Sequence, residues 1–167
     1  MNQESSAMAL NSPCVVRAAQ AQDCNRMADL AVQLGYECTR QDVQRRLRDM
    51  QNSEQYAVFV AELSGRQVVG WISAYVFRAV VLDRFAEISG LIVDEAFRGS
   101  GIGKILLDTA EKWARHVGCT AISVHSNVIR DRAHRFYANN GFELLKAQRV
   151  FRKPLSGHSS FTASSGT

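Results

Sequence analysis

Three apolar segments follow one another between residues 56 and 93, and this succession limits the possible folds more than any other feature of the sequence. Tyr56–Leu63 (YAVFVAEL) is typical of a strand, and the turn sequence Ser64-Gly65-Arg66-Gln67 leads into a second strand, Val68–Phe77. A third strand is expected over Phe85–Val93. Successive strands joined by short connections favour an antiparallel meander.

Before the meander the sequence predicts one short strand and two helices. The strand is expected over Cys14–Arg17. The first helix is bounded by Asp23, which can cap it, and by Gly35, which can stop it. The second begins at Thr39, and Asp42 three residues later resembles a capping box.

After the meander the apolar spacing changes to that of helices. A helix is predicted from Ile102 to a stop at Gly118, then a strand over Ala121–His125, a helix that ends at Asn140-Gly141, and a final strand over Phe142–Phe151. The predicted fold class is therefore α/β, an α+β mixed sheet with helices on its faces. The expected order of elements is β-α-α-β-β-β-α-β-α-β in a single domain.

Composition sets the expected limits of this domain. Of the 167 residues, 46% are hydrophobic, which is enough for a core without disulfides or metal. A flexible leader is expected over residues 1–13, the domain over 14–155, and a disordered Ser/Gly/Thr-rich tail over 156–167. The four cysteines form no C-x-x-C pair and the four histidines are scattered, so no metal site is expected.

Charge and hydropathy bear on location and partners. The longest apolar stretch, Val68–Phe77, is far shorter than the roughly 20 residues that span a bilayer, and Met1–Ser12 lacks the features of a signal peptide. We therefore expect a cytoplasmic protein with no membrane partner. The net charge of +4 fits nucleic acid or a smaller polyanion. Aromatic residues make up only 8% and fall mostly in strands, which argues against nucleic acid. A homodimer is left open.

The segment from Val93 to Lys104 (VDEAFRGSGIGK) joins a predicted strand to a helix start and carries the strongest chemical signal. Its three glycines allow a tight turn and a close approach of the backbone to a ligand. The unpaired N–H groups of a first helical turn form an anion site, and Arg98 adds positive charge beside it. The segment predicts binding of a phosphate or pyrophosphate.

Two better-known phosphate loops do not fit this segment, and one structural alternative stays open. A Walker loop needs Ser or Thr after G-K, whereas Ile105 follows Gly103-Lys104. A Rossmann loop follows the first strand of a parallel βαβ unit, whereas this loop follows a meander. The alternative is that the glycines only make the turn.

Two motifs, set within the predicted order of strands and helices, resemble those of the Gcn5-related N-acetyltransferases, the GNAT superfamily. Arg98-Gly-Ser-Gly-Ile-Gly103 matches the family's R-x-x-G-x-G acetyl-coenzyme-A loop, and Gly90-Leu-Ile-Val-Asp-Glu95 is similar to its fourth strand. Ala133-His-Arg-Phe-Tyr-Ala-Asn-Asn-Gly-Phe-Glu143 is similar to its A-x-x-x-Y-x-x-x-G-F motif. The resemblance in element order covers roughly residues 14–155. It implies transfer of an acetyl group from acetyl-CoA to a primary amine of a small molecule, in a ternary complex and without metal.

The resemblance also implies which residues hold the coenzyme. Backbone N–H groups of the loop take the pyrophosphate, a bulge near Gly90 splays the strand from its neighbour, and the N–H of Leu91 or Ile92 serves as oxyanion donor. Many family members carry Asn at the position of Arg130, so either Asn127 substitutes here or Arg130 reaches a coenzyme phosphate. The implied cofactor-binding residues are Leu91, Ile92, Val93, Arg98, Gly99, Ser100, Gly101, Ile102, Gly103, Lys104, Asn127 and Arg130.

Two residues are expected to carry the proton transfers. Tyr137 is the candidate acid that protonates the coenzyme thiolate, the alternative being an aromatic at the core boundary with its hydroxyl in water. Glu87 is the candidate base, because an acid in an otherwise apolar strand is costly to bury without purpose. The alternatives are an exposed strand position for Glu87 and a chain of waters as the base. His125 and His134 are expected to be structural or exposed.

The acceptor is the least constrained part of this prediction. In the family the acceptor pocket lies between the first two helices and at the hairpin around residues 78–84, which here makes Tyr36, Glu37 and Asp83 candidates for contact with a cationic amine. Polyamines, aminoglycosides, amino acids and protein amino termini all stay open. The alternatives to a small-molecule enzyme are a non-catalytic acyl-CoA-binding or sensing domain and a protein N-terminal or lysine acetyltransferase.

Overall fold

The computed structural model of the protein describes residues 13–155. The chain divides into two units, of which the first ends at His125 and the second begins at Ser126. The expected tail, and the expected leader apart from Pro13, lie outside the described residues. The limits of a single domain over 14–155 stay a prediction.

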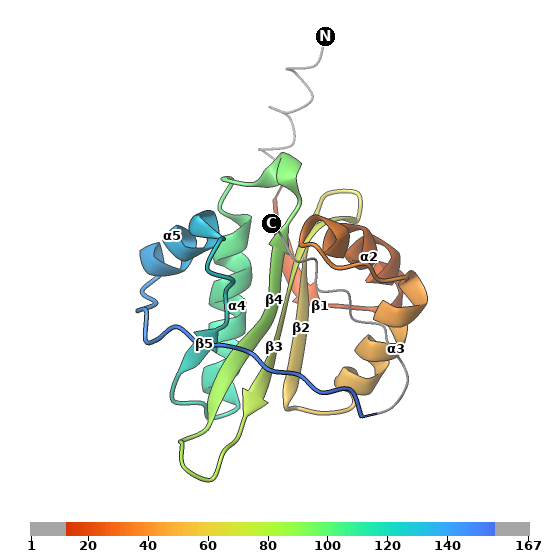
Figure 1. Cartoon of the computed structure of the whole chain (residues 1–167). Helices are drawn as coiled ribbons and strands as arrows, with labels where there is room; N and C mark the ends of the chain where they lie inside the picture. Colours follow the sequence, from red (N-terminus) through yellow and green to blue (C-terminus); the bar gives the residue numbers. More distant parts are fainter. Residues whose placement is uncertain (1–12, 156–167) are drawn as a thin grey trace. The chain divides into compact units, whose positions relative to one another are not determined.

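A five-stranded sheet forms the centre of the first unit (Figure 1), and its strands lie in sequence order. They are β1 (Val15–Ala18), β2 (Tyr56–Leu63), β3 (Gln67–Phe77), β4 (Phe85–Val93) and β5 (Ile122–Val124). The first four pair antiparallel, and β5 runs parallel to β4. The predicted meander is confirmed. The bounds of β2 and β4 are as predicted, those of β3 differ by one residue at its start, and those of β1 and β5 differ by one residue at each end.

Helices cover both faces of this sheet (Figure 1). On one face lie α2 (Cys24–Gln33), which follows the 3₁₀ turn η1 (Ala21–Asp23), and α3 (Arg40–Gln51). The indole Nε1 of Trp71 on β3 donates a hydrogen bond of 3.2 Å to the carbonyl of Met27 on α2. On the other face lies α4 (Ile102–His116).

The predicted capping box at the start of α3 is confirmed, whereas Asp23, the N-cap residue of α2, makes no capping hydrogen bond with its side chain. The hydroxyl of Thr39 accepts from the backbone N–H of Asp42 at 3.1 Å, and the Asp42 carboxylate accepts from the N–H of Thr39 at 3.1 Å, which is the capping box at the start of α3. The helices α2 and α4 are followed by Gly35 and Gly118, whose φ angles of 90° and 76° favour glycine.

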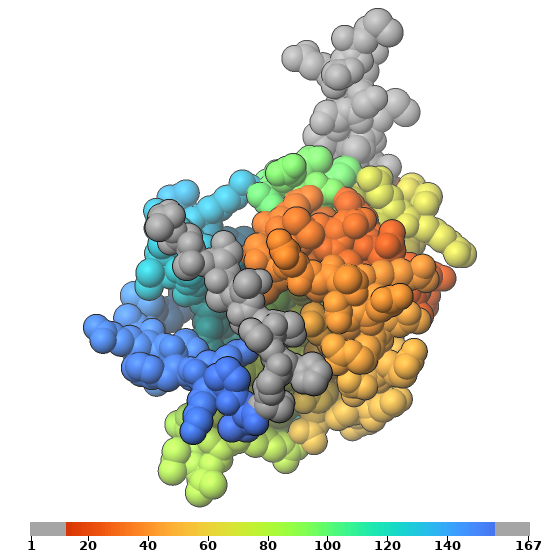
Figure 2. All heavy atoms as spheres, turned by 45° about the vertical axis from the view of Figure 1, so that its right-hand side comes forward, coloured from red at the N-terminus to blue at the C-terminus, as the bar shows by residue number. Residues whose placement is uncertain are grey.

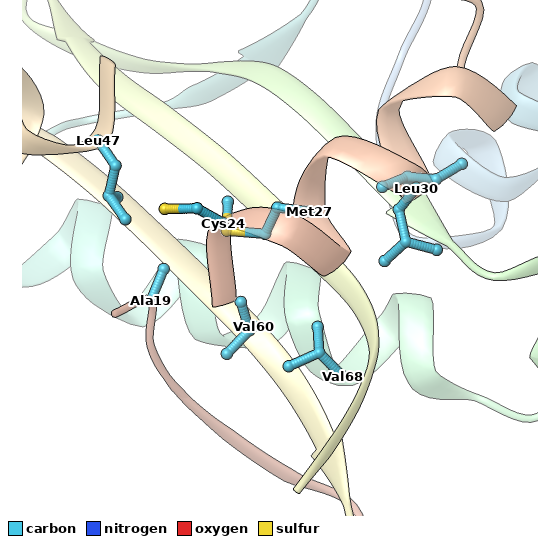
Figure 3. Packing of buried hydrophobic residues seen from close by; sticks show 8 residues of the cluster. Ala19, Cys24, Met27, Leu30, Leu47, Val60 and Val68 are labelled. Atoms are coloured by element: carbon cyan, nitrogen blue, oxygen red, sulfur yellow. The ribbon is translucent and has the colours of Figure 1, made fainter. Parts of the chain in front are cut away.

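The core between the sheet and the helices α2 and α3 is apolar and closely packed (Figure 3). Cys24, Met27 and Leu30 point from α2 toward the sheet, at the helical spacing that the sequence shows. They meet Leu47 of α3 and strand side chains such as Val60, which is fully buried. Each fully buried side chain of this size contributes about 1.5–3 kcal/mol, so this core fixes the position of α2 on the sheet.

The second unit contains α5 (Asp131–Asn139). The strand expected over 142–151 is not formed, and the prediction of that strand is wrong: these residues have no regular secondary structure. Among the described residues no strand pairs with them, and a strand needs a partner for its backbone N–H and C=O groups. Their apolar side chains are exposed, with Leu144 at 95% and Phe151 at 88%.

Candidate functional site

The glycine-rich loop turns the chain from β4 into α4. The strand leads through the 3₁₀ turn η2 (Glu95–Phe97) to Gly99 and Gly101, and both of these glycines have a φ of 87°. Gly101 is the N-cap of α4. Left-handed backbone costs other residues about 1–2 kcal/mol, which explains glycine at both positions. Gly103 lies in the first turn of the helix.

Backbone donors gather at this turn. Within residues 13–155, the N–H groups of residues 99–103 donate to no protein acceptor. The flanking donors are used internally, because Arg98 donates to the carbonyl of Glu95 at 3.4 Å and Lys104 donates to that of Gly101 at 3.0 Å. Successive unpaired N–H groups at the start of a 15-residue helix form an anion-binding site. The candidate donors are therefore fewer than the expected run from Arg98 to Lys104.

The charged side chains of the loop are held by protein partners. Arg98 donates from Nε to the carbonyl of Val93 at 3.0 Å and from Nη2 to Oε1 of Gln33 at 3.3 Å, which fastens the loop to the end of β4 and to α2. The ammonium of Lys104 lies 2.9 Å from both carboxylate oxygens of Asp108, one helical turn away. The positive charge of Arg98 is thereby fixed beside the unpaired N–H groups.

Two residues of α2 that the sequence did not single out also hold the loop. Arg26 forms an ion pair with Asp94, and its Nε donates to the carbonyl of Val68 at 3.1 Å. Oε1 of Gln33 accepts a hydrogen bond of 3.0 Å from the N–H of Glu95. Sequence reasoning missed both, because polar residues on an amphipathic helix look like a solvated face.

A β-bulge interrupts the pairing of β4 with β3. Ser73 lies opposite Gly90 while Ala74 lies opposite Ile88, so Ser89 is the extra residue. Its hydroxyl lies 2.8 Å from that of Ser73. The bulge is therefore one residue before the expected Gly90. Gly90 itself is required for packing, since a Cβ there would stand 2.7 Å from Cζ3 of Trp71.

At the bulge β4 also parts from β5. The two strands pair only from Ala86 with Ile122 to Ile88 with Val124. Beyond this point the backbone N–H of Asp94 donates a hydrogen bond of 2.8 Å to the carbonyl oxygen of Val69 on β3. Since N–H directions alternate along a strand, that of Ile92 also points to β3, whereas that of Leu91 points to the edge that β5 has left. Of the two expected oxyanion donors, Leu91 is the one on this edge.

The bulge also sets which face Glu87 occupies. Glu87 lies opposite Tyr75, whereas Leu91 lies opposite Ile72. Tyr75 and Ile72 point to opposite faces of β3, so Glu87 and Leu91 do too. Residues four apart on a regular strand share a face, and the bulge at Ser89 removes this relation between Glu87 and Leu91.

Glu87 is the centre of a buried polar cluster. It is only 9% exposed, so it is not the exposed strand residue of the alternative interpretation. Its Oε1 accepts from the hydroxyl of Tyr75 at 2.9 Å and lies 3.0 Å from Nδ1 of His125. Burial, together with the hydrogen bond to the negative Glu87, raises the pKa of Tyr75 to about 12. His125, expected to be structural or exposed, has a side chain that is 72% exposed and bonded to Glu87.

Tyr137 lies in the last turn of α5, in the second unit. The N–H of Phe142 donates to the carbonyl of Tyr137 at 3.0 Å, and the N–H of Gly141 donates to the carbonyl of Ala138 at 3.1 Å. Gly141 has a φ of 84°. This is a Schellman ending, and the ring of Phe142 lies 5.3 Å from that of Tyr137, as its hydrophobic contact requires. The Y-x-x-x-G-F spacing thus has a structural cause.

The hydroxyl of Tyr137 has the properties of a neutral proton donor. Burial raises the pKa of Tyr137 to about 12, against a smaller lowering by the charge of Arg130. Its ring packs edge-on against Phe136 at 5.3 Å, with 72° between the planes. Burial thus keeps the phenol protonated throughout the neutral range of pH.

Asn127 organises the turn before α5. Its Oδ1 accepts from the N–H of Ile129 at 3.2 Å, and its carbonyl accepts from the N–H of Arg130 at 3.0 Å. Nε2 of His134 lies 2.9 Å from the same carbonyl. His134 is thus in a structural contact. Whether Asn127 or Arg130 contacts the coenzyme stays a prediction.

The candidate acceptor residues lie in two loops of the first unit. Tyr36 and Glu37 are exposed between α2 and α3, and Asp83 is exposed in the loop between β3 and β4. Figure 1 shows this second loop, yellow-green, protruding beyond the strands, and Figure 2 shows its atoms at the lower edge of the view. Its apolar side chains are unburied, with Val80 and Val81 at 104% and 85% exposure.

Residues 13–155 contain neither a cluster of metal ligands nor a helix that could span a membrane. No group of three or more His, Cys, Asp and Glu side chains is placed to hold a metal ion. No helix of this part of the chain has the length and apolar character needed to cross a membrane.

Comparison with protein families gives a match over most of this structure. A family model described as the acetyltransferase (GNAT) family matches residues 24–142. The uncharacterized N-acetyltransferase YhdJ of Bacillus subtilis is 41% identical over 69 residues, which are 41% of this chain and 47% of that protein. The aminoalkylphosphonate N-acetyltransferase of Salmonella typhimurium is 37% identical over 82 residues, 48% of this chain and 53% of the relative. The matched part thus spans about half the length of each relative.

Solved structures share the fold. The aminoglycoside N-acetyltransferase AAC(6')-Iy, solved in complex with CoA, superposes with a TM-score of 0.77 at 18% sequence identity, covering 86% of this chain and 96% of that one. At this identity the likeness shows the fold alone. It confirms the predicted α/β fold class.

Proposed function

This chain belongs to the acetyltransferase (GNAT) family, whose model matches residues 24–142, and we propose that it transfers the acetyl group of acetyl-CoA to a primary amine of a small molecule. The observation that carries this proposal is the row of unpaired N–H groups at residues 99–103, held beside Arg98 at the start of α4. Such a row suits the pyrophosphate of a coenzyme.

The remaining coenzyme contacts follow from β4. The residues 91–93 run beside the pantetheine, and the N–H of Leu91 on the edge left by β5 stabilises the oxyanion that forms when the amine attacks the thioester. Asn127 and Arg130 complete the coenzyme contacts. One oxyanion-hole donor is worth about 10²–10³ in kcat.

Two proton transfers complete the reaction. The acceptor ammonium loses a proton on the side of Glu87, to the carboxylate or to water. The leaving thiolate gains one from Tyr137, which its raised pKa of about 12 keeps protonated at neutral pH. Between these two transfers, direct attack of the free amine on the thioester forms the C–N bond and breaks the C–S bond, with no acyl-enzyme. The second proton of the amine nitrogen returns to the Tyr137 oxygen through water.

We propose a small cationic amine as the acceptor. The Salmonella typhimurium relative named above acts on an aminoalkylphosphonate, which is a small molecule. Tyr36, Glu37 and Asp83 supply an aromatic ring and negative charge on exposed loops of this chain. A cytoplasmic location and a homodimer stay predictions.

The test is titration of the purified full-length protein with acetyl-CoA, followed by a thiol-release screen over amines. The panel contains polyamines, aminoglycosides, aminoalkylphosphonates, amino acids and peptides with free amino termini. Turnover with a small amine that falls at least tenfold in Tyr137→Phe, with acetyl-CoA binding unchanged, supports the proposal.

Other outcomes select between the alternatives. Binding of acetyl-CoA without turnover of any amine selects the sensing domain. Turnover of the peptides alone selects a protein acetyltransferase. Absence of binding overturns the coenzyme site at residues 99–103.

A further inference from the structure

We propose that His125 is the base that takes the proton from the acceptor ammonium, and that Glu87 is the positioning residue that holds its imidazole. This inference rests on the proposed acetyl transfer and replaces direct proton uptake by Glu87. It follows from three features of the first unit: a hydrogen bond, a contrast in exposure and a place in the sheet.

The hydrogen bond fixes the tautomer of His125. Nδ1 of His125 lies 3.0 Å from Oε1 of Glu87. A carboxylate only accepts hydrogen bonds, so Nδ1 must carry the proton and Nε2 keeps its lone pair. A carboxylate behind an imidazole also stabilises the imidazolium that forms when Nε2 takes a proton. The pair therefore has the arrangement of a base and its orienting acid.

The exposure of the two side chains indicates that His125 is the base and Glu87 the positioning residue. The side chain of His125 is 72% exposed, whereas that of Glu87 is 11% exposed. An ammonium that arrives from solvent meets the imidazole, while Oε1 of Glu87 is already occupied by the hydroxyl of Tyr75 at 2.9 Å. A general base has to come within hydrogen-bond reach of the proton that it abstracts. His125 meets this condition better than Glu87.

The sheet places His125 where the two parallel strands part. Glu87 pairs with Ser123 on β5, and His125, two residues further, lies on the same face as Ser123 and hence on that of Glu87. The last paired residues are Ile88 and Val124. His125 therefore stands at the start of the β4 edge on which the N–H of Leu91 lies.

Proton transfer to His125 precedes the attack of the amine on the thioester. The N–H bond of the ammonium breaks and its proton goes to Nε2 of His125, so the imidazole becomes an imidazolium paired with the Glu87 carboxylate. The neutral amine attacks the thioester carbon, the C–N bond forms, and the C–S bond breaks. The leaving thiolate takes the proton of Tyr137, and the second proton of the amine nitrogen returns to the Tyr137 oxygen through water. The imidazolium then releases its Nε2 proton to water.

Two ionisable side chains of the described residues, Glu87 and Tyr75, form a hydrogen-bonded chain with His125. Glu87 on β4 contacts it directly, and Tyr75 on β3 shares the same carboxylate oxygen. Tyr56 on β2 follows, with its ring 6.4 Å from that of Tyr75. Tyr75 anchors Glu87 from the side opposite to the imidazole.

The kinetic test compares His125→Gln with His116→Gln, since His116 is an exposed histidine at the end of α4, outside this cluster. With the best amine of the screen, we expect kcat to fall about 100-fold in H125Q, with the dissociation constant of acetyl-CoA unchanged. H116Q should match the wild type. Added imidazole should restore part of the activity of His125→Ala.

A spectroscopic test reports on the role of Glu87 and needs no turnover. In ¹⁵N-labelled protein, long-range ¹H–¹⁵N correlations should show His125 protonated at Nδ1, and Glu87→Gln should shift the population toward the Nε2–H tautomer. A His125 protonated mainly at Nε2 in the wild type would overturn the pairing.

The failures of the two proposals are distinguishable. Turnover that survives in H125Q, or that falls far more in E87Q than in H125Q, overturns the role of His125 and leaves the acetyl transfer standing. Absence of turnover with every amine overturns the proposed function and this role together.

Discussion

The side-chain oxygen of Gln33 accepts a 3.0 Å hydrogen bond from the backbone N–H of Glu95, 62 residues further along the chain. The same oxygen accepts from Arg98 at 3.3 Å. Gln33 is the last residue of α2, and Tyr36 follows three residues later in the candidate acceptor loop. One glutamine thus joins the element that carries the acceptor loop to the entry of the coenzyme loop.

Replacing Gln33 by Leu should loosen the coenzyme loop. The N–H of Glu95 and the guanidinium of Arg98 lose their shared acceptor, at a cost of about 1 kcal/mol per hydrogen bond. Because the loop must be held to bind the pyrophosphate, we expect the dissociation constant of acetyl-CoA to rise about five- to tenfold, with kcat at saturation little changed. Titration calorimetry and steady-state kinetics measure the two effects.

Gln41→Leu is the matched control, since Gln41 is an exposed glutamine on α3. It should bind acetyl-CoA as the wild type does. An unchanged dissociation constant in Q33L would show that Arg98 and Asp94 hold the loop without Gln33.

Gly101→Ala and Gly65→Ala should separate strain from coenzyme binding. Both glycines have positive φ, 87° and 80°, and a Cβ at either position meets no atom within 4 Å. Each substitution should therefore lower the free energy of unfolding by about 1 kcal/mol. Only Gly101 lies at the row of unpaired N–H groups, so only G101A should weaken acetyl-CoA binding. Denaturant unfolding and calorimetry of both variants measure this, and equal affinities would contradict the assigned site.

The sequence predicted this loop well because its signal is local. Left-handed backbone at Gly99 and Gly101, the N-cap of α4 and the apolar spacing of the helix all act within a few residues. The bulge belongs instead to the pairing with β3, where Ser73 lies opposite Gly90 and Ala74 opposite Ile88. No local pattern marks which of two adjacent residues, Ser89 or Gly90, leaves the ladder.

Gly90→Ala should destabilise the fold by overpacking. An added Cβ would lie 2.7 and 2.9 Å from Cζ3 and Cη2 of Trp71, closer than carbon atoms pack. We expect the free energy of unfolding to fall by about 1–3 kcal/mol, as measured by denaturant titration. Trp71→Leu removes these ring atoms, so the double variant should lose less than the sum of the two single variants. Strict additivity would contradict the contact.

Partners distant in sequence also explain what the sequence left undecided at Glu87. Its burial and its contact with His125 depend on the parallel pairing of β4 with β5, which the chain reaches only after α4. Likewise, the alternation of Phe142–Phe151 resembles that of a strand, but a strand also needs an edge to pair with. The features that the sequence predicted correctly are those that one helix or turn determines, such as the capping box at Thr39 and the start of α4 after Gly101.

Asp23 should make the free energy of unfolding of the first unit depend on pH in the acidic range. Burial raises the pKa of Asp23, but the hydrogen bonds from Arg17, at 2.7 and 2.9 Å, and from the N–H of Gln20, at 2.8 Å, outweigh it and leave the pKa below its usual value. Since the pKa is lower in the folded state, the stabilisation is present above the unfolded-state pKa of about 3.9 and is lost as pH falls through the folded-state value.

Asp23→Asn tests this sign directly. At pH 7 the free energy of unfolding of the variant should be about 2 kcal/mol lower than that of the wild type, because the charge-assisted hydrogen bonds to Arg17 are lost. The difference should shrink as pH falls through the lowered folded-state pKa of Asp23, because the wild-type carboxyl then also becomes protonated. Asp49→Asn, at an exposed position of α3, is the control and should follow the wild type over the same range of pH. Urea unfolding from pH 7 down through the acidic range measures the three proteins, and a D23N difference that stays constant over this range would show that the Asp23 carboxylate does not stabilise the fold through its charge.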